Sequence, residues 1–273
     1  MEFGKQLSLV RERTPLVQCI TNFVTVNDCA NIVLAAGGTP SMADDVREAA
    51  EAVGGAAALV CNLGAIAAVD AMLSAGRAAN ELGKPVILDP VAAGNTALRR
   101  AESDRLLEGV KFAVIRGNAS EIRALARRER AGSGVDVSSE DAVTEENLPR
   151  TVETARLLAK QSGAVAAVSG PIDVVTDGER TVLLRNGCAT MARITGSGCM
   201  LTAMLGAFCG ADPQHPFEAA CAAVAAMGVA GDLAEAQRLQ NGTGNATFRT
   251  DLIDAVFNLT EEQLNGGVRY EIY

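Results

Sequence analysis

Short β-branched runs alternate with longer alanine- and leucine-rich segments along most of the chain, and this alternation restricts the possible folds more than any other feature. Predicted strands lie at 16–21, 57–62, 86–89, 112–116 and 165–169, and predicted helices at 26–36, 43–53, 66–82, 98–107, 120–130 and 148–162. Strand–helix–strand units of this kind produce a mainly parallel sheet with helices on both faces. We therefore predict a three-layer α/β fold in which residues 1–273 form a single domain.

The last third of the chain departs from this alternation. Two short strands, 174–175 and 181–185, flank Asp177-Gly178, which is a strong hairpin signal. Beyond them the pattern is helical, with helices predicted at 200–209, 217–239 and 248–258. The segment 131–147 is rich in glycine, serine and acidic residues, so we predict a surface loop there.

Composition excludes several classes of protein. The chain is 48% hydrophobic and 21% charged, as in a folded globular protein rather than a disordered one. Its net charge of −9 argues against nucleic acid as a partner, because binding to phosphates needs clustered cations. The one histidine, His215, argues against a Ser-His-Asp triad and excludes a zinc site built on several histidines.

The cysteines and the N-terminal residues indicate a cytoplasmic protein. Seven cysteines, an odd number with no Cys-x-x-Cys pair, suit a reducing compartment better than a disulfide framework. The first residues are polar and contain no apolar segment of a signal peptide. The longest apolar run, Ala219 to Gly231, is too short to cross a bilayer, so we expect no membrane association.

Polar residues or glycines end or closely follow nearly every predicted strand. Asn22, Asn62 and Asp89 do so in the first half of the chain, and Asn118 and Ser169 in the second. In an open α/β sheet, ligands bind beyond the carboxyl ends of the strands. Strand ends are also polar simply because loops are solvated, so any single position has two explanations. The joint pattern favours a ligand-binding cleft.

The sharpest local feature is Gly196-Ser197-Gly198-Cys199, which precedes a predicted helix. Two glycines permit a sharp turn and the close approach of a ligand, and free N–H groups at the helix start would bind an anion. The P-loop motif Gly-x-x-x-x-Gly-Lys-Ser/Thr is missing from the chain, and Gly-x-Gly-x-x-Gly does not follow the first strand. These features exclude a P-loop nucleoside triphosphatase and argue against a dinucleotide-dependent dehydrogenase.

Cys199 has two interpretations. In the first turn of a helix the dipole favours the thiolate and lowers the thiol pKa from about 8.5, which would equip Cys199 as a base near neutral pH. The other interpretation is a small buried thiol that serves only in packing, as most of the other six cysteines do. The position directly after Gly-Ser-Gly favours the first.

The segment Asn118-Ala119-Ser120-Glu121 also has two interpretations. Asn at a helix N-cap with Glu three residues later forms a capping box. The same two side chains lie on one face of the helix start and could bind Mg²⁺ directly or through water, with Asp89 as a second carboxylate. Arg116, just before this segment, would supply positive charge for phosphates. The sequence does not separate the cap from the metal site.

The chain resembles the hydroxyethylthiazole kinase family, thiamine-salvage enzymes of the ribokinase-like superfamily, over nearly its whole length. The matching segments are 19–24, 38–43, 88–92, 115–122, 168–175 and 195–202. The Asn-x-x-Glu and Gly-x-Gly elements are common to the superfamily. Cys199, in place of the usual Asp, together with Thr21-Asn22 and Pro40-Ser41-Met42-Ala43, is specific to the family.

The resemblance implies a single-domain ribokinase-like fold and ATP-dependent phosphorylation of the primary alcohol of 5-(2-hydroxyethyl)-4-methylthiazole. It implies the following roles: Cys199 as the catalytic residue, Met42, Gly196 and Asn22 in substrate binding, Arg116, Ser169 and Asn118 on the ATP side, and Asp89 and Glu121 in the Mg²⁺ region. The family commonly has Thr at the position of Ser169, and Ser keeps the hydroxyl group.

The resemblance further implies a homotrimer with its active sites at subunit interfaces. Three alternatives to the thiazole kinase remain open at this point. One is a kinase for another small alcohol such as a hydroxymethylpyrimidine, and another is an ATP- or ADP-dependent repair dehydratase on the same fold, which Cys199 disfavours because that class carries Asp after Gly-x-Gly. The third is a non-catalytic trimeric binding protein, which gives no reason for Asp89, Glu121 and Cys199 to coexist at strand ends.

Overall fold

The computed structural model describes residues 1–127 and 142–273, which form one nine-stranded sheet in the order β2-β1-β3-β4-β5-β6-β7-β8-β9. The strands are β1 Leu16–Ile20, β2 Thr39–Ser41, β3 Ala58–Asn62, β4 Val86–Asp89, β5 Val114–Asn118, β6 Val165–Ser169, β7 Asp173–Thr176, β8 Thr181–Leu184 and β9 Tyr270–Ile272. β1 to β6 are parallel, and β7, β8 and β9 join the sheet antiparallel. The predicted mainly parallel sheet is confirmed.

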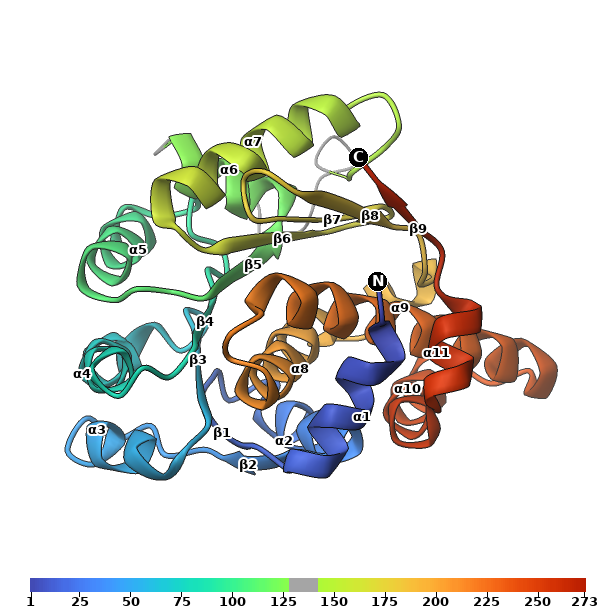
Figure 1. Ribbon diagram of the computed structural model, residues 1–273, viewed down its shortest axis with the longest axis horizontal. Coiled ribbons are helices and arrows are strands. Elements are labelled where there is room, and N and C mark those ends of the chain that lie inside the picture. The colour runs from blue at the N-terminus through green and yellow to red at the C-terminus, as the bar shows by residue number, and fades with distance from the viewer. Residues whose placement is uncertain (128–141) are drawn as a thin grey trace.

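Helices cover both faces of the sheet (Figure 1). Those on one face are α3 Ala49–Ala52, α4 Val69–Glu81, α5 Ala97–Gly109, α6 Ala119–Arg127 and α7 Leu148–Ser162. Those on the other face are α1 Phe3–Arg13, α2 Val26–Ala36, α8 Ser197–Ala211, α9 Pro216–Asn241, α10 Asn245–Asn258 and α11 Glu261–Gly267. The 3₁₀ turns are η1 Val53–Gly55, η2 Ile66–Ala68 and η3 Ala189–Arg193.

The alternation of side chains along each strand produces these layers. In β3, Val60 points into the hydrophobic cluster beneath α8 and α9, whereas its neighbours Leu59 and Cys61 point into the cluster beneath α3 to α7. Successive side chains of a strand face opposite sides of the sheet, so a strand covered on both faces is apolar at every position. This explains why the central strands have continuous apolar sequences.

Helix α9 is the central helix of its layer. Its length and composition alone would let it cross a membrane, but 83% of its most apolar window is buried inside the protein. Helices α1, α8 and α10 pack around it, and α9 also contacts the sheet. The burial is that of a core helix, since the apolar surface that a bilayer would cover is already covered by protein.

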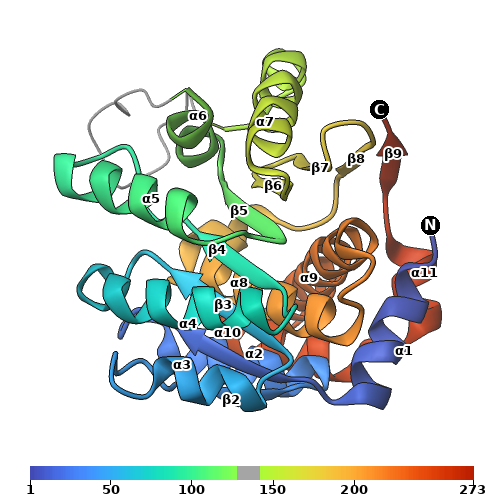
Figure 2. The same cartoon turned by 60° about the vertical axis from the view of Figure 1, so that its left-hand side comes forward.

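The two ends of the chain meet on one side of the molecule (Figure 2). The ring of Phe3 in α1 packs edge-on against that of Tyr270 in β9, with centroids 4.9 Å apart. The sequence pattern predicted neither element, nor the short α11 and β2. β9 has three exposed residues and is held by pairing with β8, so no apolar periodicity marks it.

The helix predicted at 43–53 is wrong over most of its length, because α3 begins only at Ala49. The carboxylate of Asp45 accepts the backbone N–H of Arg47 and pairs with its guanidinium, which holds the preceding residues in a turn. A local side-chain bond of this kind competes with the helix. Residues 128–130 of another predicted helix, and most of the loop predicted at 131–147, lie outside the described residues.

Candidate active site

Polar side chains gather at the edge of the sheet where the parallel strands end. β3 ends at Asn62 and β4 at Asp89, and these two residues are opposite each other in the strand register. Asn118 and Ser169 end β5 and β6 and form a second such pair. Because these strands are adjacent, their last side chains follow one another across the sheet. Asn22 lies two residues beyond β1, on the other side of β3.

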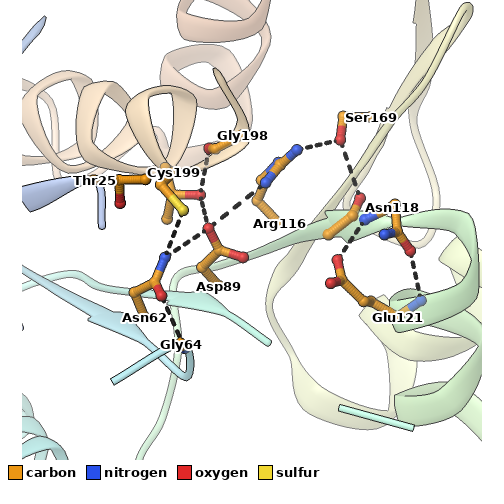
Figure 3. A network of polar contacts seen from close by, with 12 residues as sticks. Thr25, Asn62, Gly64, Asp89, Arg116, Asn118, Glu121, Ser169, Gly198 and Cys199 are labelled. Carbon is orange, nitrogen blue, oxygen red and sulfur yellow. Dashed lines mark hydrogen bonds and ion pairs between the residues drawn. The ribbon is translucent and has the colours of Figure 1, made fainter. Parts of the chain in front are cut away.

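The N-terminus of α8 lies over this edge. The helix packs on β1, β3 and β4, and it begins at Ser197 after Gly196, whose φ of +85° is the left-handed conformation that glycine adopts without strain. A Cβ at position 196 would lie 2.6 Å from Cγ2 of Thr25, so the turn also needs the space that glycine leaves. Cys199, in the first turn of α8, therefore faces the strand ends (Figure 3).

Asp89 lies at the centre of the polar network and is 1% exposed. Its Oδ2 accepts Nδ2 of Asn62 at 3.0 Å and Oγ1 of Thr202 at 2.8 Å, and it lies 3.6 Å from Nη1 of Arg116. Its Oδ1 is buried and has no partner. Burial raises the pKa of this carboxyl, and the positive charge of Arg116 opposes the rise.

Cys199 is held as a hydrogen-bond acceptor. Its Sγ accepts Nδ2 of Asn62 at 3.2 Å and Nδ2 of Asn22 at 3.5 Å. Burial and the nearby Asp89 nevertheless raise the pKa of the thiol, which the side-chain hydrogen bonds with Thr25 and Asn62 and the charge of Arg116 only partly offset. The predicted lowering of this pKa is wrong, because the dipole of one helix turn does not compensate for the loss of water around the sulfur.

Arg116 connects Asp89 to the end of β6. One Nη atom faces Asp89 and the other donates to Oγ of Ser169, whereas Nε is buried without a partner. The guanidinium also lies against Gly198, where a Cβ would be 2.7 Å from Nη2 and 2.9 Å from Cζ. A cation thus sits at the positive end of α8, an arrangement in which both groups would be stabilised by an anion between them.

Asn118 and Glu121 form the capping box that the sequence left open. Oδ1 of Asn118 accepts the backbone N–H of Glu121 at 2.9 Å, and Oε2 of Glu121 accepts the backbone N–H of Asn118 at 2.9 Å. The other oxygen of Glu121 accepts the N–H of Ala92 at 2.8 Å. Burial and the charge of Asp89 raise the Glu121 pKa. Across the described ranges, no three His, Cys, Asp or Glu side chains are grouped as metal ligands.

Met42 and Gly196 lie toward the other side of the site. Met42 directly follows β2, the strand beyond β1, and is partly buried against the hydrophobic cluster that Cys199 also contacts. Gly196 touches Thr25, which follows the Asn22 turn. The residues assigned to the substrate and those assigned to ATP therefore lie on opposite sides of the Asp89–Cys199 centre.

Sequence reasoning missed two members of the network and one neighbour. The sequence marks Asn62 only as the end of a strand. Thr202 lies one helical turn beyond Gly198, and its hydroxyl is also 3.1 Å from the carbonyl oxygen of Gly198. Asp173, at the start of β7, accepts the backbone N–H of Gly170 at 2.9 Å. Burial raises the pKa of Asp173 to about 7. The signal for Asn62 was its place at the end of a buried strand, which Asp89 shares.

The chain is similar to known proteins over nearly its whole length. Residues 7–262 match the hydroxyethylthiazole kinase family. A hydroxyethylthiazole kinase from Clostridium acetobutylicum is 45% identical over 271 residues, which cover 98% of this chain and 99% of that one. Another, from Desulfovibrio desulfuricans, is 47% identical over 263 residues, covering 93% and 92%.

Solved structures extend the likeness to three dimensions. A hydroxyethylthiazole kinase protein from Pyrococcus horikoshii superimposes with a TM-score of 0.86 at 33% identity, covering 99% of this chain and 98% of that one. A Staphylococcus aureus pyridoxal kinase in complex with AMP-PCP and pyridoxal has a TM-score of 0.57 at 14% identity, covering 80% and 87%, which shows a shared ribokinase-like fold alone. The near-complete coverage at 33–47% identity shows that the chain belongs to the hydroxyethylthiazole kinase family.

Proposed function

We propose that this chain is a single-domain kinase that transfers the terminal phosphoryl group of ATP to the primary alcohol of 5-(2-hydroxyethyl)-4-methylthiazole, in thiamine salvage. Membership of the family supports the reaction. Within this chain, one observation carries the proposal: a continuous polar network lies beside the N-terminus of α8. It begins at Cys199 and ends at Ser169, the last residue of β6, and the residues between them are Asn62, Asp89 and Arg116. Phosphoryl transfer depends mostly on positioning and on neutralising charge, and this network supplies groups for both.

The alcohol would bind on the side of Met42, Asn22 and Gly196. The thioether of Met42 suits a small neutral ring that contains sulfur. The substrate hydroxyl would lie beside Cys199, where Sγ accepts its hydrogen bond. Because burial keeps the Cys199 thiol largely protonated at neutral pH, its role in this proposal is to orient the hydroxyl rather than to remove its proton in advance.

ATP would bind on the side of β5 and β6. The phosphates would lie against the first N–H groups of α8, with Arg116 and Ser169 as side-chain contacts and Asn118 beside them. The unpartnered Nε of Arg116 supports this placement, because a buried guanidinium N–H without an acceptor could donate to a phosphate oxygen of ATP. The net charge of −9 does not oppose ATP, since these groups act locally.

The residues present also fit Mg²⁺. Oδ1 of Asp89 is buried without a partner, and each oxygen of Glu121 accepts one backbone N–H, which leaves further lone pairs for a metal-bound water. Asp89 and Glu121 would hold the ion, which when bound neutralises the charge of the ATP phosphates.

We also propose a cytoplasmic homotrimer with its active sites at subunit interfaces, and no nucleic acid or membrane partner. Phe23 and Val24 are 90% and 57% exposed directly after Asn22, and a neighbouring subunit would cover such an apolar pair. The seven cysteines are all free, as a reducing compartment requires.

A coupled assay that measures ADP release with the thiazole alcohol, ATP and Mg²⁺ tests the reaction. We expect turnover that depends on the thiazole alcohol. Background ADP release with this alcohol, together with turnover of a hydroxymethylpyrimidine or a sugar, would replace the proposed substrate. An ATP-independent activity or a dehydration activity would overturn the kinase assignment.

A further inference from the structure

The side-chain amide of Asn62 makes the four hydrogen bonds that it can form, two as a donor through Nδ2 and two as an acceptor through Oδ1. Its two Nδ2 hydrogens reach Sγ of Cys199 at 3.2 Å and Oδ2 of Asp89 at 3.0 Å. Its Oδ1 accepts the backbone N–H of Gly64 at 2.9 Å and Nδ2 of Asn22 at 3.3 Å. The residue is 1% exposed, so these four partners replace the water molecules that would otherwise bind its amide.

The orientation of the Asn62 amide is determined by these partners. A flipped amide would place Oδ1 against the sulfur and the Asp89 carboxylate, and would place Nδ2 against the N–H of Gly64. Two acceptors would then meet, and so would two donors, which costs the buried hydrogen bonds on both sides. Only one rotamer of Asn62 therefore satisfies its surroundings.

The absence of a side chain at Gly64 independently supports a fixed position of the Asn62 amide. A Cβ at position 64 would lie 2.6 Å from Oδ1 of Asn62 and 3.0 Å from Cβ and Nδ2 of Asn22. The turn after β3 thus leaves just the space in which the two asparagine side chains meet. On the side of Asp89, the strand register fixes the position of Asn62, because the two residues are paired at the ends of β3 and β4.

We propose that Asn62 is a positioning residue, which uses the two hydrogens of one amide to set the distance and direction between the Cys199 sulfur and the Asp89 carboxylate. The inference rests on the proposed function, in which the sulfur orients the alcohol and the carboxylate serves the phosphate region. Asn62 touches neither substrate. It keeps the two groups in the relative geometry that in-line transfer needs, and a small displacement of either group reduces turnover more than it reduces binding.

The variant Asn62→Asp tests the amide hydrogens with little change in volume. Oδ1 remains to accept from Gly64 and Asn22, whereas the new carboxyl has at most one hydrogen and cannot serve both Cys199 and Asp89. We expect kcat to fall by about 10-fold or more, with the KM values for ATP and the thiazole alcohol within about 3-fold of those of the parent chain. Asn62→Ser, which keeps an acceptor for Gly64 and adds no charge, is the second variant if Asn62→Asp does not fold.

A double-mutant cycle with Cys199→Ala separates positioning from mere stability. If Asn62 acts through Cys199, the double variant loses less than the product of the two single losses in kcat. A full product of the two losses, or a rise in KM with unchanged kcat, would overturn the inference. Asn258→Ala, at an exposed asparagine bonded only within α10, is the matched control and should leave kcat unchanged.

Thiol alkylation without substrates distinguishes this inference from the proposed function. Peptide mapping after iodoacetamide treatment gives the alkylation rate of Cys199, with the half-buried Cys188 as internal reference. We expect Asn62→Asp to lower the rate at Cys199 relative to Cys188 by about 3-fold or more, since the sulfur loses an N–H donor beside a new carboxyl. An unchanged ratio would overturn the inference even if the chain is an active kinase. A lowered ratio in a chain without thiazole kinase activity would overturn only the function.

Discussion

At the scale of the residue, the sulfur of Cys199 receives hydrogen bonds from Asn22 and Asn62 while burial disfavours its charged form. Both effects follow from the surroundings, and neither can be inferred from the helix position that the sequence indicates. A sequence places Cys199 in the first turn of a helix, but the burial of its sulfur depends on strands far away in the chain. The direction of its pKa shift was therefore predicted wrongly although its position was predicted correctly.

Cys199→Ala should lower kcat by about 10- to 100-fold and change the KM for ATP by less than about 3-fold. In the proposed function the thiol orients the alcohol, whereas the phosphates would bind to Arg116 and the start of α8, so we expect the loss to fall on turnover. Steady-state kinetics with varied ATP measures both constants. Cys188→Ala is the matched control, and equal turnover in both variants would leave Cys199 with a packing role only.

Asp173 should make the stability of the protein depend on pH. An acid whose pKa rises from about 4 to about 7 on folding is ionised in the unfolded chain before it is ionised in the folded one, so the free energy of unfolding falls as pH rises through this window. Asp173→Asn removes this titration. From pH 4 to pH 8 the free energy of unfolding of the variant should therefore rise relative to that of the parent chain, by a few kcal/mol at most. Urea denaturation at both pH values measures this. A difference in the free energy of unfolding between variant and parent that stays constant from pH 4 to pH 8 would contradict it.

At the scale of the element, α2, β4 and α7 have the bounds that the sequence predicted. Each has a strong pattern of its own, and α2 and α7 end at a left-handed glycine. Elements that depend on partners were missed, since β9 exists only as a neighbour of β8. The capping box of α6 was one of two open interpretations, because Asn118 and Glu121 could equally cap the helix or bind Mg²⁺. The bond from the N–H of Ala92 to the other oxygen of Glu121 could not be predicted, since Ala92 lies in a distant loop.

Gly198→Ala should weaken ATP binding without weakening the fold. A Cβ there overlaps the guanidinium of Arg116, a flexible group that can move away, whereas alanine favours a helix by up to about 1 kcal/mol. We expect the KM for ATP to rise by about 10-fold because Arg116 leaves Ser169 and Asp89, and Tm to stay equal or rise. Gly266→Ala, a helical glycine with open space around it, is the control. An unchanged KM would mean that Arg116 has no role in ATP binding.

At the scale of the whole molecule, the order of the strands arranges the site. Met42 and Asn22 follow β2 and β1, and the last residues of β3, β4, β5 and β6 are Asn62, Asp89, Asn118 and Ser169, so the site residues lie in the spatial order of the sheet. The chain leaves β1 toward β2 and then crosses to β3 on the other side, and ligands bind at such a switch point. The sequence predicted which strand ends are polar. The spatial order became visible only with the sheet, and it separates the alcohol side from the ATP side.

The side of the site proposed for the alcohol is open to solvent. Phe23, which directly follows Asn22, is 90% exposed there. If a second subunit covers this side, light scattering should give about three times the 28.2 kDa mass of one chain. Phe23→Ser should then shift the protein toward smaller species and raise the KM for the thiazole alcohol more than that for ATP, since the proposed ATP side lies at the other end of the site. Leu98→Ser, at a leucine 57% exposed on α5 in the opposite layer, should leave both mass and KM unchanged. A stable and fully active monomer would contradict this proposal, because one chain would then complete the site.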